Sequence, residues 1–482
     1  MTATSSAQSV LDVRTLVGGE WKSSSETSPI TYPFDGRVVG TLHHTSLADV
    51  DAAVRSAHAT FQTWRDVPAH QRSKALASLA KLMEQRAEEL ANVMTLQSGK
   101  TIAESRTEVT RSISTISISA EEAKRIGGEV IAMDAVAPGV GKLGFTVRMP
   151  MGVVAGISPF NAPLNTICHK LGPALAGGNT LVVKPHPQGA GLATLLAQAC
   201  LDAGIPSGAF NVVHGGAEVG RALTSHPLVA VVNFTGSGAV ADRIIRDIGL
   251  KRTLLELGGN APTIVCADAN LAKAVPQCVE AAFGLTGQSC ISTQRIYVQR
   301  AIFDAFVAKL VDAARAKKTG DPMDPATGIG PMISEDAARR IQEWIEEAVQ
   351  QGARVLCGGR RTGASVEATV IVDVKPEMRV VCEEIFGPVV TVVPFDTLDE
   401  ALQVANDTPW GLKSGIFTAD LNAALAAARR LEYGTVNINA ASRARVDHEP
   451  SGGVKASGWG KEGPRYAIEE MTYLKMVTIA PA

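Results

Sequence analysis

Apolar residues recur three and four positions apart through the first quarter of the chain. This spacing places them on one face of a helix, and it is followed by Leu76, Leu79, Leu82, Met83, Leu90 and Val93. We therefore predict a helical layer over about residues 47–126. The next stretch, residues 127–147, contains several glycines and short β-branched runs, which favour an extended hairpin arm.

Short apolar runs then alternate with helical patterns. Strands are expected over residues 152–157, 180–183, 210–214 and 228–234, with a helix over residues 189–203. A second alternating series occupies residues 262–433, with helices over residues 300–316, 336–351 and 420–431. Strands that alternate with helices form βαβ units and a parallel sheet. The chain is thus predicted to be an α/β protein with two α/β domains.

Composition excludes several classes of protein. The 482 residues carry a formal net charge of -2, and the basic pairs Lys317-Lys318 and Arg339-Arg340 lie in stretches expected to face solvent, so no nucleic-acid partner is predicted. No run of apolar residues is long enough to cross a membrane. The first ten residues lack a basic segment followed by an apolar one, so we expect a loose tail and no signal peptide.

The seven cysteines are odd in number, widely spaced and free of CxxC pairs. This pattern argues against a disulfide framework and against a zinc site. We expect no bound metal and a cytoplasmic location. Most single cysteines are small buried residues, which is the interpretation that we adopt for Cys168, Cys200, Cys266 and Cys278.

Three local patterns could carry chemistry. Gly236-Ser-Gly-Ala-Val-Ala241 follows an apolar run and precedes a helical stretch, as a phosphate-binding turn does, although an ordinary tight turn would look the same. Cys290 lies in a polar segment that contains a glycine, where a thiol on a loop could react. Glu256 lies between two leucines, and burial there would raise its pKa towards that of a general base; otherwise it is a surface residue at a strand end.

Taken together and in order, these patterns resemble the aldehyde dehydrogenase superfamily over about residues 18–477. The order and spacing of Glu256 and Cys290 are also typical of that family. The matching segments are Ser158-Pro-Phe-Asn-Ala-Pro163, Lys184-Pro185, Phe234-Thr-Gly-Ser237, Glu256-Leu-Gly-Gly259, Gly287-Gln-Ser-Cys290, Glu383-Glu-Ile-Phe-Gly-Pro388 and Gly452-Gly-Val-Lys455 to Gly463.

The resemblance implies a Rossmann-type cofactor domain over residues 1–126 and 149–257 and a catalytic α/β domain over residues 258–440. Residues 127–148 and 470–482 would form a β-hairpin oligomerisation arm. In relatives the C-terminal strand joins a neighbour's sheet, so the β-rich residues 473–479 predict a homodimer or homotetramer. The alternative is an edge strand within the same subunit.

The resemblance also implies a reaction, the oxidation of an aldehyde to a carboxylic acid with NAD(P)+. Cys290 would attack the aldehyde and form a thiohemiacetal and then a thioester. Asn161 and the backbone N–H of Cys290 would bind the oxyanion, and Glu256 would activate the hydrolytic water. Relatives that transfer the acyl group to coenzyme A typically lack this glutamate. The alternatives are such a transferase and a protein that keeps the fold without catalysis.

The cofactor residues are assigned by the same resemblance. Lys184 would bind the adenosine ribose, Ser237 the pyrophosphate, and Glu384 with Phe386 the nicotinamide riboside. Relatives that prefer NAD often carry a glutamate where this chain has Pro187, so NADP is predicted to be accepted, and the missing repulsion would also allow a preference for NADP. The remaining residues expected at the cofactor are Ile157, Ser158, Pro159, Phe160, His186, Gly220, Phe234, Gly236, Val240, Leu257 and Gly258.

The aldehyde pocket is expected beside the Asn161 and Cys290 motifs and along residues 441–451. Its predicted residues are Phe160, Ala162, Asn165, Ser289, Ile291, Arg443, Arg445 and His448. The arginines suggest an anionic aldehyde, although Arg445 could instead form a structural salt bridge. The C-terminal segment resembles lactaldehyde and phosphonoacetaldehyde dehydrogenases, whereas the segment after Lys184 resembles benzaldehyde and vanillin dehydrogenases. Small Ala162 and Ser451 would admit an aromatic aldehyde, so both substrate classes stay open.

Overall fold

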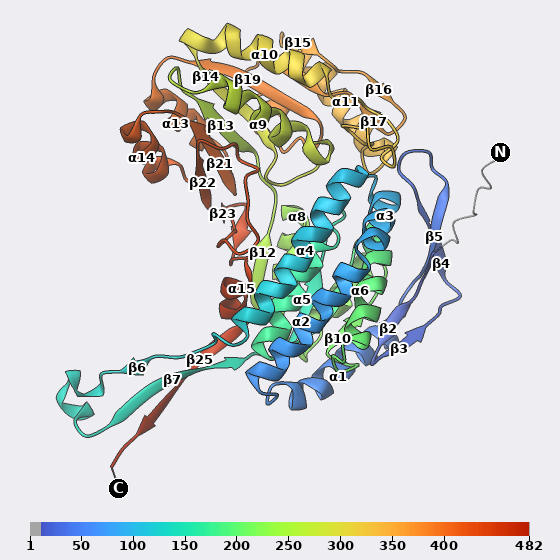
Figure 1. The fold of residues 1–482 in the computed structure, drawn as a ribbon, viewed down its shortest axis with the longest axis vertical. Helices are drawn as coiled ribbons and strands as arrows, with labels where there is room; N and C mark the ends of the chain where they lie inside the picture. Colours follow the sequence, from blue (N-terminus) through green and yellow to red (C-terminus); the bar gives the residue numbers. More distant parts are fainter. Residues whose placement is uncertain (1–10, 482) are drawn as a thin grey trace.

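The computed structural model describes residues 11–481. The loose tail expected at residues 1–10 lies outside them. Two α/β units follow one another along the chain, and a long β arm projects from the N-terminal unit (Figure 1). The α/β fold predicted from the alternating patterns is confirmed.

The predicted helical layer is present as four helices. Helix α1 begins after Ser46, whose side chain accepts the backbone N–H of Asp49, and α4 begins with a capping box between Thr101 and Glu104. These caps satisfy N–H groups that a helix start leaves open. The helices are α1 (Leu47–Trp64), α2 (Ala69–Gln85), α3 (Ala87–Ser98) and α4 (Ile102–Glu122).

The first sheet has eight strands in the order β24-β12-β11-β8-β9-β10-β2-β3. From β12 to β10 neighbouring strands are parallel, and β24 and β2 pair antiparallel at the two ends of that core. The strands are β2 (Thr15–Val17), β3 (Glu20–Lys22), β8 (Val153–Ile157), β9 (Thr180–Lys184), β10 (Phe210–Val212), β11 (Val229–Thr235), β12 (Arg252–Glu256) and β24 (Gly458–Trp459).

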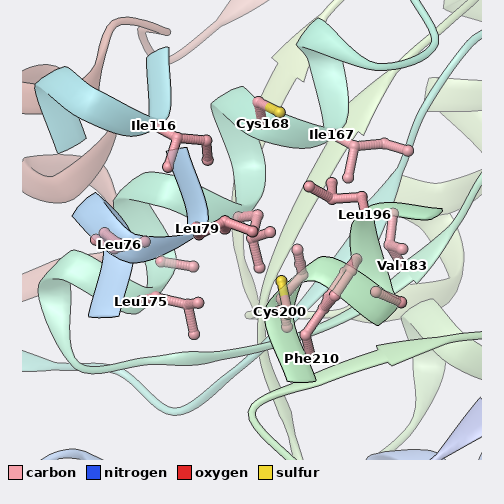
Figure 2. Close-up of a cluster of buried hydrophobic side chains, with 14 of the residues drawn as sticks. Leu76, Leu79, Ile116, Ile167, Cys168, Leu175, Val183, Leu196, Cys200 and Phe210 are labelled. Atoms are coloured by element: carbon pink, nitrogen blue, oxygen red, sulfur yellow. The ribbon is translucent and has the colours of Figure 1, made fainter. Parts of the chain in front are cut away.

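Helices cover this sheet on both faces, as buried parallel strands require. One face carries a cluster of buried apolar side chains from α2, α4, α5 and α6, among them Leu79, Ile116 and Leu196 (Figure 2). Cys168 and Cys200 lie in this cluster, and the predicted burial of the four structural cysteines is confirmed. The helices of the unit that follow α4 are α5 (Asn165–Gly177), α6 (Ala190–Asp202), α7 (Ala217–Ser225) and α8 (Gly238–Ile248).

The second sheet has seven strands in the order β15-β18-β19-β14-β13-β21-β22. All neighbours are parallel except the β15 and β18 pair. The strands are β13 (Ala261–Val265), β14 (Thr293–Gln299), β15 (Arg354–Cys357), β18 (Thr369–Val372), β19 (Val389–Phe395), β21 (Lys413–Phe417) and β22 (Thr435–Ile438).

The C-terminal half contains seven α-helices in the part of the chain that the structure describes, and they include the three predicted over residues 300–316, 336–351 and 420–431. They are α9 (Leu271–Phe283), α10 (Phe303–Arg315), α11 (Glu335–Gln350), α12 (Arg379–Cys382), α13 (Leu398–Asn406), α14 (Leu421–Arg430) and α15 (Pro464–Glu470).

The arm is a three-stranded sheet in the order β25-β7-β6. Strand β25 (Thr472–Ile479) pairs antiparallel with β7 (Leu143–Pro150) over eight residue pairs, and β6 (Val130–Ile131) lies on the other side of β7. The predicted hairpin region and C-terminal strand are therefore parts of one sheet within the chain. Because only β7 pairs with β25, the outer edge of β25 is open among residues 11–481.

Smaller elements complete the fold. A three-stranded sheet contains β1 (Leu11–Val13), β5 (Val38–His43) and β4 (Thr27–Thr31), and two short hairpins pair β16 (Arg361–Thr362) with β17 (Ser365–Val366) and β20 (Trp410–Gly411) with β23 (Val454–Lys455). Short 3-10 turns are η1 (Met133–Ala135), η2 (Ala137–Gly139), η3 (Pro187–Gly189), η4 (Gly284–Gly287) and η5 (Arg300–Ile302). Over residues 11–481, no helix has the length and apolar character needed to cross a bilayer.

Candidate active site

A cavity of about 400 Å³ is lined by the side chains of Asn161, Glu256 and Cys290. Asn161 follows strand β8, Glu256 ends β12, and Cys290 lies in the loop between η4 and β14. The first two positions are at the carboxyl ends of parallel strands, where α/β sheets usually bind ligands. The fold thus brings together the three residues predicted to be catalytic.

The backbone before Cys290 is strained. Leu285 and Thr286 both have φ of +55°, which costs energy for residues with a side chain and is often found at functional sites. The Leu285 N–H donates to the Glu104 carboxylate at 2.5 Å, and the Thr286 hydroxyl donates to the Gly330 carbonyl at 3.1 Å. These contacts hold the turn that presents the thiol.

Three motif segments meet at this loop. A Cβ on Gly259 would lie 2.3 Å from the carbonyl oxygen of Cys290, and one on Gly258 would lie 2.4 Å from the Glu384 carboxylate. The side-chain amide of Gln294 donates to the Gly259 carbonyl at 3.1 Å and accepts the Ile385 N–H at 2.8 Å. The backbones of the three segments are therefore held in direct contact.

Asn161 is positioned through its backbone. The Lys100 ammonium donates to the Asn161 carbonyl at 3.1 Å and forms a buried ion pair with Glu108. The other Glu108 oxygen accepts the N–H groups of Leu164 and Asn165 at 2.9 and 3.0 Å. A buried pair between Lys100, just before α4, and Glu108 of α4 therefore fixes the turn that carries Asn161.

Burial controls the protonation of the two central groups. It raises the pKa of the Cys290 thiol to about 12, with further increases from the charges of Glu384 and Glu256. Burial also raises the pKa of Glu256, and so does the neighbouring carboxylate of Glu462. Arg445, Lys170 and Lys461 oppose that shift. Burial therefore favours the protonated form of the Cys290 thiol and shifts the pKa of Glu256 upwards, which is the direction that a general base requires.

Three arginines line the cavity, and each is paired with a carboxylate. Arg111 donates through Nε and Nη2 to Asp447 at 3.1 and 2.7 Å. Arg443 pairs with Glu280 at 2.8 Å. Arg445 pairs with Glu462 at 2.8 Å and contacts His169 at 3.2 Å. The salt bridge considered for Arg445 is present, although Arg445 also lines the cavity.

The predicted pocket residues separate into two groups. Phe160 and His448 do not line this cavity: the Phe160 ring packs at 5.3 Å from His186 and 6.0 Å from Phe386, and His448 is exposed on the surface. The cavity lining does contain the other predicted residues, which are Ala162, Asn165, Ser289, Ile291, Arg443 and Arg445.

A second cavity, of about 450 Å³, lies on the N-terminal unit. It is lined by four residues predicted to bind the cofactor, which are Ile157, Lys184, Gly220 and Val240; Lys184 is the one expected at the adenosine ribose. The predicted phosphate turn is placed as expected, since β11 ends at Thr235 and α8 begins at Gly238 with Ser237 as its N-cap. A helix N-terminus that follows a glycine-containing turn suits a phosphate group.

The other residues predicted to bind the cofactor differ in their burial and contacts. The buried Ser158 hydroxyl has no hydrogen-bond partner among residues 11–481, so it fits a site that a ligand completes. Glu384 accepts the Gly259 N–H at 3.0 Å, Leu257 and Gly258 are buried, and Pro187 is exposed. Within the same residues, no group of three His, Cys, Asp or Glu side chains could hold a metal ion.

Comparison with known proteins decides the family. The model of the aldehyde dehydrogenase family matches residues 21–477. The chain belongs to this family. It is 43% identical over 464 residues to a 3-sulfolactaldehyde dehydrogenase of Priestia aryabhattai, covering 96% of this chain and 97% of the relative. It is 38% identical over 476 residues to the NADP-dependent succinate-semialdehyde dehydrogenase of Escherichia coli, covering 96% and 97% of the two chains.

Solved aldehyde dehydrogenase structures have the same fold. Aldehyde dehydrogenase 21 of Physcomitrella patens, solved with the reaction product succinate, superposes with a TM-score of 0.95 at 36% identity and covers 98% of each chain. The predicted family, fold and cofactor class are confirmed: the protein is an NAD(P)-dependent aldehyde dehydrogenase. These relatives argue against the alternative of a protein that keeps the fold without catalysis.

Several cavity residues were not predicted from the sequence. They lie on helices α4, α5 and α9 and in the C-terminal segment, and they are Thr107, Arg111, Thr166, His169, Glu280 and Glu462. Thr107 and Arg111 are four residues apart on α4 and so share a helical face. That spacing is the one local signal for them, but it is equally typical of a solvated face.

Proposed function

We propose that the enzyme oxidises small anionic aldehydes to the free carboxylic acids, with Cys290 as nucleophile, Asn161 as oxyanion donor and Glu256 as general base. The observation that carries this proposal is one cavity that contains all three groups together with Arg111 and Arg443. Cys290, Asn161 and Glu256 support the proposed reaction, and the two arginines support the proposed class of substrate.

The Cys290 thiol first gives its proton to solvent water, and its sulfur then adds to the aldehyde carbon. This addition forms a C–S bond, converts the C=O double bond into a single bond and places negative charge on the former carbonyl oxygen. The Asn161 amide and the Cys290 N–H would donate to this oxygen, and each donor of this kind contributes about 3 kcal/mol to lowering the barrier. When bound, NAD(P)+ supplies the acceptor for the hydride that leaves the same carbon. Cys290 then holds the acyl group as a thioester.

Release of the acid requires water. Glu256 would take one proton from a water molecule while the water oxygen attacks the thioester carbon. Cleavage of the C–S bond then releases the carboxylic acid and returns Cys290 as a thiolate. The Glu256 carboxylate lines the same cavity as the thiol, which supports hydrolysis rather than transfer to coenzyme A. Product formation without coenzyme A tests this choice.

The cations of the cavity favour an anionic group at the far end of the substrate. Arg111 uses two of its three guanidinium nitrogens on Asp447, so Nη1 can donate to a carboxylate, phosphonate or sulfonate. Arg443 bonds to Glu280 through Nη1, which leaves its other nitrogens for the substrate. The two relatives named above are dehydrogenases of 3-sulfolactaldehyde and succinate semialdehyde, both anionic aldehydes.

A panel of aldehydes tests the substrate class. We expect kcat/KM to be highest for short aldehydes with a carboxylate or sulfonate and lower for benzaldehyde, for which Ala162 and Ser451 leave space in the cavity. Arg111→Met and Arg443→Met should each lower kcat/KM for the anionic aldehyde by about 10- to 100-fold, because a hydrogen bond between charged groups is lost. Benzaldehyde turnover should change little.

A matched control is Arg106→Met, which removes an exposed arginine of the same helix, paired with Glu88. This variant should leave kcat/KM unchanged for both the anionic aldehyde and benzaldehyde. Preference of the unmodified enzyme for benzaldehyde, or equal loss with both substrates in the Arg111 and Arg443 variants, would contradict the anionic class and leave the aromatic one.

We also infer that NADP is accepted, and preferred over NAD. Pro187 carries no carboxylate that would repel a 2′-phosphate. The second cavity, which we propose for the adenosine half of the cofactor, is lined by four basic residues and one acidic residue, which are Lys184, Arg221, Arg243, Arg246 and Asp247. A positive groove favours a nucleotide with an additional phosphate.

For the assembly we infer a homodimer or homotetramer built through the arm. Both faces of the arm expose large apolar side chains, including Val130, Leu143, Leu474 and Ile479, which is unusual for a surface in contact with water. Among residues 11–481, strand β25 has an open edge, and so does β22 at the end of the seven-stranded sheet. Open edges pair readily with strands of a second copy.

The cysteines support a reducing compartment for this enzyme. All seven are free thiols, and five of them are buried in the fold. Because no disulfide contributes to stability in residues 11–481, we propose that the enzyme works in the cytoplasm.

A further inference from the structure

Lys413 is the first residue of strand β21 and has no exposed surface. Removing an ammonium group from water is costly unless partners replace the water. Burial lowers the pKa of Lys413, and its contact with Glu449 opposes that shift. The buried Lys413 ammonium therefore requires ion-pair and hydrogen-bond partners that replace its water, and these partners indicate its role.

Those partners belong to one segment of the cavity wall, residues 441–451, which we call the pocket loop. The Lys413 ammonium forms an ion pair with Glu449 and donates to the Ala444 carbonyl at 3.3 Å. The other Glu449 oxygen accepts the Val446 N–H at 3.3 Å. One cation from the sheet thus ties the start and the end of the turn at residues 444–449.

The same turn carries two residues that contact the N-terminal unit. Asp447 binds Arg111 of α4 and accepts from the Asn165 amide of α5 at 3.0 Å. Arg445 pairs with Glu462 and, like Ala444 and Ser451, lines the cavity. Any shift of the turn would therefore move the wall that faces the aldehyde, while Cys290 and Glu256 lie on other segments.

We propose that Lys413 and Glu449 are positioning residues that determine aldehyde specificity by holding the pocket loop against the seven-stranded sheet. Buried ion pairs are weak sources of stability, since apolar pairs of similar size often replace them without loss. Such a pair instead fixes geometry, because its hydrogen bonds are directional. The ammonium and the carboxylate hold each other and two backbone groups in one arrangement, which apolar side chains cannot do.

The inference rests on aldehyde oxidation but not on the anionic class, because it can be tested with whichever aldehyde the enzyme uses best. Lys413→Met should raise the KM for that aldehyde at least tenfold and leave kcat and the cofactor KM within about threefold, since uniform substrate binding is lost. Lys413→Arg, which keeps the charge, should restore much of the affinity. The ratio of kcat/KM for anionic and neutral aldehydes should also change.

The double variant Lys413→Met/Glu449→Leu separates positioning from folding. It should recover the Tm that the single variant loses, because no unpaired charge stays buried, while its aldehyde KM stays high. Lys22→Met, which breaks the exposed ion pair with Asp49, is the control and should change neither quantity. An aldehyde KM of Lys413→Met within about twofold of that of the unmodified enzyme would overturn the proposal. Recovery of the aldehyde KM together with Tm in the double variant, or a rise of the cofactor KM that parallels the rise of the aldehyde KM, would also overturn it.

Discussion

The carboxylate of Glu384 accepts the backbone N–H of Gly259 at 3.0 Å, so the segment proposed to bind the nicotinamide riboside rests on the backbone that follows Glu256. Burial raises the pKa of Glu384 to about 7, and the Gly259 N–H and Arg340 limit the rise. Glu384 is thus poised to change charge near neutral pH.

Cofactor binding should follow this titration. Only the ionised carboxylate can accept hydrogen bonds from both ribose hydroxyls, so the KM for the cofactor should fall as the pH rises through about 7 and then level off. Glu384→Gln should raise this KM and remove its dependence on pH. The KM for the cofactor is measured by steady-state kinetics with saturating aldehyde from pH 6 to pH 9. If Glu384→Gln keeps the pH profile of the unmodified enzyme, the titration belongs to another group.

Cys290 should be alkylated slowly at neutral pH. Its raised pKa means that the thiolate fraction grows about tenfold for each pH unit between 7 and 9. The rate of carboxamidomethylation at Cys290, followed by mass spectrometry, should rise accordingly. Cys382 is exposed and provides an internal comparison, and Cys290→Ser should abolish both this label and NAD(P)H production. A rate at Cys290 that is already maximal at pH 7 would contradict the expected protonation.

Glu256→Gln should separate the two halves of the reaction. In the proposed mechanism the Cys290 proton leaves to solvent and Glu256 acts only on the hydrolytic water, so we expect a burst of about one NAD(P)H per active site, followed by turnover slowed about 10² to 10⁴-fold. Stopped-flow absorbance measures the burst, and intact-mass analysis should detect the acyl group on the protein. Loss of the burst itself would place Glu256 in the first half of the reaction instead.

Asn161→Ala should remove one donor to the oxyanion. The expected result is a fall in kcat of about 10² to 10³-fold with little change in the cofactor KM. The turn itself should persist, because Lys100 and Glu108 hold its backbone rather than its side chain. Asn161→Asp tests the charge: a carboxylate at this position would repel the oxyanion and should be at least as damaging.

Pro187→Glu should shift the enzyme towards NAD. A carboxylate beside the adenosine ribose would accept from its hydroxyls and repel a 2′-phosphate, so kcat/KM for NADP should fall at least tenfold relative to that for NAD. Pro187→Gln is the matched control, because it changes size and backbone freedom without charge. A large preference of the unmodified enzyme for NAD would refute the prediction before any variant is made.

Much of the site could be predicted from the sequence because its chemistry lies in short motifs. Cys290 is marked by polar and glycine neighbours, Glu256 by leucines on both sides, and the phosphate turn by its position between an apolar run and a helix. Each signal is local. Their shared cavity was inferred through the family resemblance, and the fold shows how: the ends of β8 and β12 and the loop before β14 meet at one place.

The charged wall of the cavity could not be predicted in the same way. Arg111 and Asp447 are 336 residues apart in the chain and meet through tertiary packing. Lys413 lies in a short apolar strand, where its charge gives no indication of a partner in the pocket loop. His448 illustrates the opposite error, since its place among the arginines suggested the pocket, whereas alternation within the turn directs it to solvent.

Gly258 and Gly259 limit how far this enzyme can be redesigned. A methyl group on Gly259 would overlap the backbone carbonyl of Cys290, whereas one on Gly258 would overlap the end of the Glu384 side chain. Alanine would therefore displace the backbone of the proposed nucleophile at Gly259 and the Glu384 carboxylate at Gly258. Ala162, Ala444 and Ser451 line the cavity itself, so changes of their side chains alter its shape directly. Attempts to evolve new aldehyde preferences should therefore accept changes at those three positions and reject any side chain at the two glycines.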